Sequence, residues 1–214
     1  MPVMPDREYR KMQVEALEPE TEENGAHIVE GYATVFDSPY ELWKTADMTV
    51  NEQVDRHAFD ETDMTDVIMQ YDHEGRVFAR SRNGTLQIMP DDHGLKIRAD
   101  LGGTEIGRQL YEEIKGGYTD RMSFGFTVTG QERREEEDQN GHTNILRTIT
   151  RIGKLFDVSA VSIPANDATE ISARSVGDGL IADAMKERHA HEERQRNIQK
   201  IRIMIELGGT DNDD

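Results

Sequence analysis

The amino-acid sequence predicts one α+β domain followed by a helical tail, and three observations support this fold class. Short segments rich in β-branched and aromatic residues recur between residues 27 and 163, separated by Gly, Asn and Asp turn signals. Within this region, residues 104–115 have apolar side chains four positions apart, which is typical of a helix. Beyond Arg174 most residues are good helix formers. We therefore expect a domain over residues 1–174 and a charged tail over residues 175–214.

The first half of the chain is expected to contribute several strands. Residues 9–17 are compatible with an early strand, and the run HIVEGYATVF at 27–36 has the composition of a strand. Residues 39–59 show no regular pattern and are expected to form a long loop that contains Trp43. The apolar run at 67–71 predicts a short strand that ends at Asp72-His73. Apolar and charged residues alternate over 94–101, which indicates a half-buried strand.

The second half continues this pattern after the predicted helix at 104–115, which a pair of glycines ends. Residues 121–129 predict a strand with large apolar side chains on one face and small or hydroxyl side chains on the other. A charged loop is expected at 132–141. Two further strands follow at 145–152 and 154–163, separated by a glycine.

Composition excludes several classes of protein. The chain of 214 residues has 43 acidic and 25 basic side chains, and its net charge of -18 disfavours binding to a nucleic-acid backbone. No apolar run approaches the roughly 18 residues of a membrane-spanning helix, and the N-terminus lacks the apolar region of a secretory signal. The absence of cysteine excludes disulfides, a thiol nucleophile and thiolate zinc sites. His189 and His191 would point to different sides of a helix and could not bind one metal ion together, so we expect no metal site. We also expect no cofactor.

Three residues occupy positions that are unusual for purely structural side chains. His73 ends an apolar strand between two acids, and Ser123 lies in mid-strand on the face with small side chains. Asp157 is expected to share a strand face with Leu155 and Val161, where an unpaired carboxylate would cost several kcal/mol. Together they could form a serine–histidine–acid triad.

Each of these residues also has an ordinary structural explanation. A serine within a strand is usually structural, a histidine beside acids is usually solvated, and an aspartate on an apolar face often bonds to the backbone. Taken alone, the three residues therefore favour the structural interpretation.

Six short segments, in order along residues 27–174, change this balance. Together they resemble the tailed-phage prohead maturation proteases, a family related to the herpesvirus assemblin serine proteases. The matching segments are Glu30-Gly31-Tyr32-Ala33-Thr34-Val35-Phe36, Ala58-Phe59, the apolar run ending in Asp72-His73, Asp92-His93-Gly94-Leu95, Met122-Ser123-Phe124-Gly125-Phe126, and Leu155-Phe156-Asp157-Val158-Ser159 with Pro164-Ala165-Asn166.

The resemblance implies an assemblin-like fold, with a mostly antiparallel, β-barrel-like core and flanking helices. It also implies that His73 is the general base, Ser123 the nucleophile and Asp157 the third member of the triad. The family commonly has glutamate at the position of Asp157, so a backbone group or water is expected to make up the shorter reach. Where the family usually has Pro-Gly before Ala-Phe, this chain has Arg56-His57, which makes His57 an alternative base.

The resemblance further implies an oxyanion hole with the backbone amide of Ala165 or Asn166 as donor. The alternative is that Pro164-Ala165-Asn166 is a turn that ends a strand.

The implied activity is that of a serine endopeptidase of capsid maturation. Such an enzyme enters the phage prohead in the host cytoplasm and cleaves the scaffolding portion of the major capsid protein, and also itself. Its partners would be the capsid protein, the scaffolding region and further copies of itself, with no nucleic acid and no membrane. The alternative function is a non-catalytic or fused scaffolding protein whose helical tail directs shell assembly.

The tail has an apolar stripe that requires a partner, formed by Ile198, Ile201, Met204 and Ile205 at helical spacing. A stripe of this length does not stabilise an isolated helix in water. It is therefore expected to dock on the protease body, on a second copy or on the capsid–scaffold complex.

Overall fold

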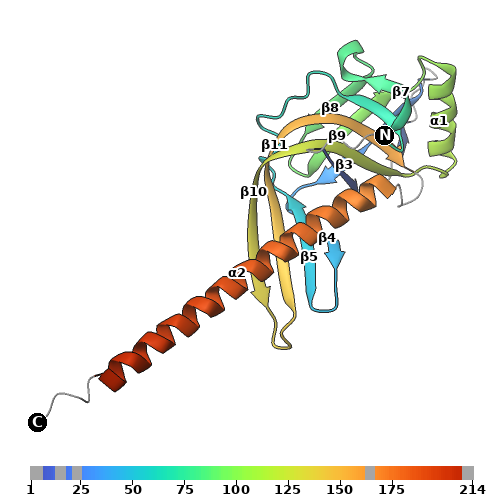
Figure 1. Ribbon diagram of the computed structural model, residues 1–214. Helices are drawn as coiled ribbons and strands as arrows, with labels where there is room; N and C mark the ends of the chain where they lie inside the picture. The colour runs from blue at the N-terminus through green and yellow to red at the C-terminus, as the bar shows by residue number, and fades with distance from the viewer. Residues whose placement is uncertain (1–6, 13–17, 21–25, 162–166, 209–214) are drawn as a thin grey trace, which may run out of the picture.

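The computed structural model describes residues 7–12, 18–20, 26–161 and 167–208, which form two β-sheets and two α-helices (Figure 1). The seven-stranded sheet has the order β1-β10-β11-β5-β4, with β6 pairing with another part of β11 and β7 pairing with β6. Its strands are β1 (Glu8–Met12), β4 (Tyr40–Lys44), β5 (Met48–Val54), β6 (Ile68–Tyr71), β7 (Glu74–Arg80), β10 (Arg121–Glu137) and β11 (Thr143–Val161). The four-stranded sheet has the order β2 (Glu18–Glu20), β3 (Ile28–Val35), β9 (Gly94–Asp100) and β8 (Leu86–Pro90). A short 3₁₀ helix, Ser81–Asn83, follows β7.

The predicted α+β class is confirmed, but the predicted barrel is not. Most strand pairs are antiparallel, whereas β5 and β6 pair with β11 in parallel. Among the described residues, one isolated bridge between Phe36 and Val54 connects the two sheets, and no ladder closes them into a barrel. The core is therefore enclosed by two open sheets.

Three local expectations also need correction. Residues 39–59 contain strands β4 and β5 in place of one long loop. The expected charged loop at 132–141 is shorter, because β10 continues to Glu137. Strand β11 is continuous through Gly153, where a Cβ atom would lie 2.7 Å from Thr129 Cγ2. Glycine at this position thus allows β10 and β11 to approach closely, and does not separate two strands.

Helix α1 (Glu105–Lys115) confirms the predicted helix. The Thr104 side chain caps its first turn by accepting a hydrogen bond of 3.0 Å from the Gly107 backbone amide. Leu110 and Ile114 lie on its buried face and pack into the main core. The helix therefore covers one end of the two sheets.

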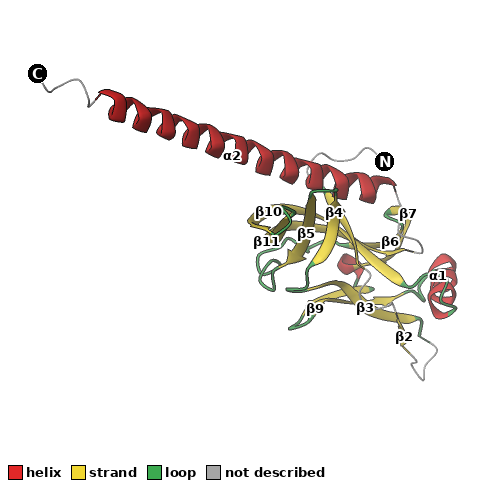
Figure 2. Cartoon of the chain, turned by 90° about the horizontal axis from the view of Figure 1, so that it is seen from below, coloured by secondary structure: helices red, strands yellow, loops and turns green. Residues whose placement is uncertain are grey.

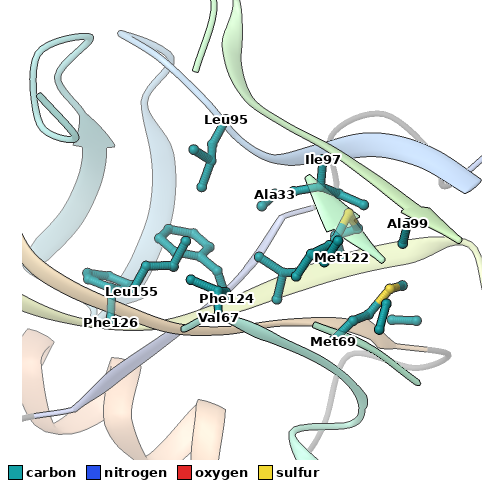
Figure 3. Packing of buried hydrophobic residues seen from close by; sticks show 14 of the residues in the cluster. Ala33, Val67, Met69, Leu95, Ile97, Ala99, Met122, Phe124, Phe126 and Leu155 are labelled. Carbon is teal, nitrogen blue, oxygen red and sulfur yellow. The ribbon is translucent and has the colours of Figure 1, made fainter. Parts of the chain in front are cut away.

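The main core lies between the two sheets (Figure 3). Ile97 projects from the four-stranded sheet toward Met122 and Phe124 of β10, and all three are fully buried. The rings of Phe124 and Phe126 stack with centroids 4.5 Å apart. Because side chains alternate along a strand, this packing turns Ser123 and Gly125 to the opposite face of β10.

Helix α2 (Asp167–Gly208) contacts β1, β4 and β5 and then projects beyond the sheets (Figure 2). Ala184 is fully buried against Val50 and Ile145, whereas Ile198 and Ile201 on the projecting part are exposed. The side chains of Met204 and Ile205 lie outside the described residues. One helix thus spans the expected boundary at residue 174, and the division into two parts stays a prediction.

None of the helices in the described part of the chain is long and apolar enough to cross a membrane.

Candidate active site

The structure brings Ser123, His73 and Asp157 together on the face of the seven-stranded sheet that points away from the main core. His73 Nε2 lies 2.5 Å from Ser123 Oγ, and His73 Nδ1 lies 2.5 Å from Asp157 Oδ1. Ser123 and Asp157 are fully buried, and His73 is 4% exposed. The three side chains therefore form one continuous hydrogen-bonded chain through the imidazole ring.

A tight turn places His73 in this chain. Tyr71 of β6 pairs with Glu74 of β7, so Asp72 and His73 are the two residues of a hairpin turn. Both have positive φ angles, 47° and 60°, as a type I′ turn requires. Residues other than glycine are uncommon there, and such strain often occurs at functional sites. The signal in the sequence was the acidic residue and histidine directly after an apolar strand.

The register of β10 and β11 places Asp157 opposite Gly125. A Cβ atom at Gly125 would lie 2.6 Å from Asp157 Oδ2, so glycine leaves room for the carboxylate. The register shifts next to this pair, and Leu155 belongs to the main core while Asp157 faces the opposite side. The expectation that Asp157 and Leu155 share one face is therefore wrong. Asp157 also reaches the imidazole directly, so the expected backbone or water link is not needed.

Two further residues bind the Asp157 carboxylate. The Ser159 hydroxyl donates to Asp157 Oδ1 at 3.0 Å, and the Arg7 guanidinium forms an ion pair with Asp157 Oδ2. Arg7 also lies over the rings of Tyr9 and Phe156. These donors provide the hydrogen bonds that a buried carboxylate requires. Sequence reasoning assigned no role to either residue, although Ser159 belongs to a quoted motif.

The other candidate residues have different positions. His57 is exposed and its Nδ1 lies 3.1 Å from Asp60 Oδ2, so the structure does not bring this alternative base to Ser123. Ala165 and Asn166, the candidate oxyanion donors, lie outside the described residues. Within the described ranges, no group of three or more His, Asp or Glu side chains could hold a metal ion.

Strand β1 covers the site. It pairs antiparallel with β10, and Lys11 lies opposite Ser123. The Ser123 hydroxyl donates to the Arg10 carbonyl oxygen at 2.9 Å, and the Tyr9 ring packs edge-on against His73 with centroids 4.6 Å apart. A hydroxyl has one proton, so Ser123 donates either to Arg10 or to His73, but not to both at once. The Arg10 carbonyl and the Tyr9 ring thus contribute to the burial of the Ser123 and His73 side chains.

A buried ionic network attaches β1 to the sheet. Arg10 of β1 pairs with Glu52 of β5, and Arg147 of β11 bonds to Glu52 at 2.5 Å and to Glu8 at 2.8 and 2.9 Å. The Tyr40 hydroxyl donates to Glu52 at 2.5 Å. Burial alone would raise the pKa of Glu52, but the attraction of Arg10 and Arg147 holds it below its usual value. The carboxylate is therefore ionised although it is fully buried.

Comparison with known protein families assigns this chain to the serine proteases. The family model of the caudovirus prohead serine proteases matches residues 11–182, so the chain belongs to that family. The resemblance found in the sequence is thereby confirmed. Among solved structures, the chain is similar to the bacteriophage T4 capsid assembly protease, gp21, with 14% sequence identity and a TM-score of 0.39. The similarity covers 74% of this chain and 96% of that chain. No curated protein matches.

Proposed function

We propose that this chain is a serine endopeptidase in which Ser123 is the nucleophile, His73 the general base and Asp157 the residue that orients the base. The observation that carries this proposal is the hydrogen-bonded chain from Ser123 through His73 to Asp157, with both links at 2.5 Å. Family membership supports the same reaction class.

The geometry supports an acyl-enzyme mechanism. Ser123 Oγ attacks the carbonyl carbon of the scissile peptide while its proton passes to His73 Nε2. The Asp157 carboxylate accepts the Nδ1–H of the ring and stabilises the imidazolium that forms. His73 then gives the proton to the leaving amine, and a water molecule activated by the same ring hydrolyses the acyl-enzyme. An amide of Ala165 or Asn166 is the proposed donor to the oxyanion.

The proposed substrate is the scaffolding portion of the major capsid protein, cleaved inside the prohead in the host cell, and the chain also cleaves itself. Membership of the prohead protease family supports this substrate class. The projecting part of α2 is proposed to act in assembly, because the apolar side chains of Ile198 and Ile201 on it are exposed. The rival function, a non-catalytic scaffolding protein, would require the tail but not Ser123.

Co-expression with the major capsid protein of the same phage tests the proposal. Mass spectrometry and N-terminal sequencing of the products would identify cleavage of the capsid protein and of the chain itself. Ser123→Ala and His73→Ala should each abolish both, and the double variant should be little worse because the two residues act as a unit.

His57→Ala is the matched control, because it removes an exposed imidazole that does not contact Ser123. It should cleave like the unmodified chain. Continued cleavage by Ser123→Ala, or loss of cleavage in His57→Ala alone, would contradict the proposal.

A further inference from the structure

We infer that Ser159 is a positioning residue of this site, which acts through Asp157 and fixes the tautomer of His73. This inference rests on the proposed function and adds a fourth side chain to it. It concerns a buried hydroxyl that the three-residue mechanism does not use.

The position of Ser159 follows from the sheet. It lies two residues after Asp157 on β11, so both side chains point to the same face. In the ladder it lies directly opposite Ser123. Ser159 is fully buried, with Oγ 3.0 Å from Asp157 Oδ1 and 3.2 Å from His73 Nδ1. Among the residues that the structure describes, only these two side chains bond to its hydroxyl.

With a neutral imidazole and an ionised Asp157, the protons at these atoms permit one arrangement, in which Ser123 donates to His73 Nε2 and not to the Arg10 carbonyl oxygen. An ionised carboxylate has no proton to donate, so the 2.5 Å contact between Asp157 Oδ1 and His73 Nδ1 requires the proton on Nδ1. The Ser159 hydroxyl then donates to Asp157 Oδ1 and cannot donate to Nδ1. This arrangement leaves His73 Nε2 unprotonated, as a base for Ser123 must be.

The opposite arrangement would stop the reaction. If Ser159 donated its proton to His73 Nδ1, the neutral ring would carry its own proton on Nε2 and could not accept one from Ser123. The contact with Asp157 decides between the two tautomers, and the orientation of the carboxylate maintains that contact.

Ser159 and Arg7 bind different oxygens of the Asp157 carboxylate, so the two interactions compete to orient it. Arg7 binds Asp157 Oδ2, whereas His73 and Ser159 both bind Oδ1. Without the Ser159 hydroxyl, Oδ1 would keep one donor, and the carboxylate would be held by Arg7 on its other oxygen. Ser159 thus keeps Oδ1 aligned with the imidazole Nδ1–H.

The first test is the kinetics of Ser159→Ala in the full chain, with the capsid protein as substrate. Loss of a hydrogen bond to a charged group corresponds to about a ten- to hundredfold decrease in rate. We expect this decrease in kcat of Ser159→Ala, with little change in KM. Ser159→Cys keeps the size of the side chain but has a weak donor, and should lose activity to a similar degree without loss of stability. Thr34→Val removes a fully buried hydroxyl from the other sheet and should leave kcat unchanged.

The second test separates positioning from packing. In an Asp157→Asn background, Ser159→Ala should cost little further activity, because the route through the carboxylate is already lost. Proton NMR should also show the low-field His73 Nδ1–H signal shifted or broadened in Ser159→Cys, while Thr34→Val leaves it in place.

The inference is overturned if both Ser159 variants keep the full kcat, or if Ser159→Ala costs the same factor in both backgrounds. These outcomes differ from failure of the proposed function, in which Ser123→Ala would still cleave. An inactive Ser123→Ala beside fully active Ser159 variants would refute only the role of Ser159.

Discussion

Glu52→Gln should strongly destabilise the protein, because this substitution removes one charge from a closed ionic network. Glu52 is fully buried, and its carboxylate with that of Glu8 balances the guanidinium groups of Arg10 and Arg147. Glutamine keeps the volume but leaves two cations to share one carboxylate, and its amide nitrogen would face other donors. Loss of one partner from a buried ion pair costs about 3–5 kcal/mol. For a chain of this length that corresponds to a fall in Tm of roughly 6–20 °C.

Urea unfolding followed by far-UV circular dichroism would measure this loss, provided that the slope with denaturant stays constant. Glu41→Gln is the matched control, since Glu41 is exposed on the neighbouring strand β4 and lies 4.0 Å from Lys44. It should change the free energy of unfolding by less than about 0.5 kcal/mol. A loss of less than about 1 kcal/mol in Glu52→Gln would refute the argument that this network is buried and closed in solution.

Three further outcomes are expected. The pKa of Glu52 is held below its unfolded value, so its stabilising contribution is present at neutral pH and is lost as pH falls through the folded pKa. Between pH 7 and pH 3, the urea midpoint of Glu52→Gln should therefore fall less steeply than that of the unmodified chain. Cleavage should decrease between pH 8 and pH 5 as His73 becomes protonated, and a flat profile would exclude a histidine base. A chain ending at Arg188 should keep its Tm, whereas one ending at Arg174 lacks Ala184 and should melt lower; equal melting temperatures would support the boundary at residue 174.

The elements predicted correctly are those whose signal is local. Alternation predicted strand β9, and four-residue spacing with two terminal glycines predicted helix α1. The parallel pairing of β5 and β6 with β11 was not predicted, because it joins segments about 90 residues apart that have no mutual signal in the sequence. The barrel-like core was expected only from resemblance, and the order of the strands shows that the described sheets do not close into a barrel.

In the candidate site, too, some residues were predicted from local signals in the sequence, whereas contacts between distant segments were not. His73, Ser123 and Asp157 could be found from motifs and from their unusual positions in strands. The ion pair between Arg7 and Asp157 spans 150 positions and depends on strand β1 lying beside β10, so no local pattern reveals it. Ser159 belongs to a quoted motif, but its contacts with Asp157 and His73 depend on a strand register that only the three-dimensional structure shows.

Helix α2 also determines how the isolated protein behaves in solution. Its 42 residues extend for about 63 Å at 1.5 Å per residue, whereas a compact body of about 160 residues has a radius of gyration of about 15 Å. The helix leaves the body on one side, so the frictional coefficient of a monomer exceeds that of a sphere of equal mass. A monomer will therefore elute early from a calibrated gel-filtration column and resemble a larger assembly. Light scattering or sedimentation equilibrium, which measure mass independently of shape, are the appropriate methods for counting the copies in solution.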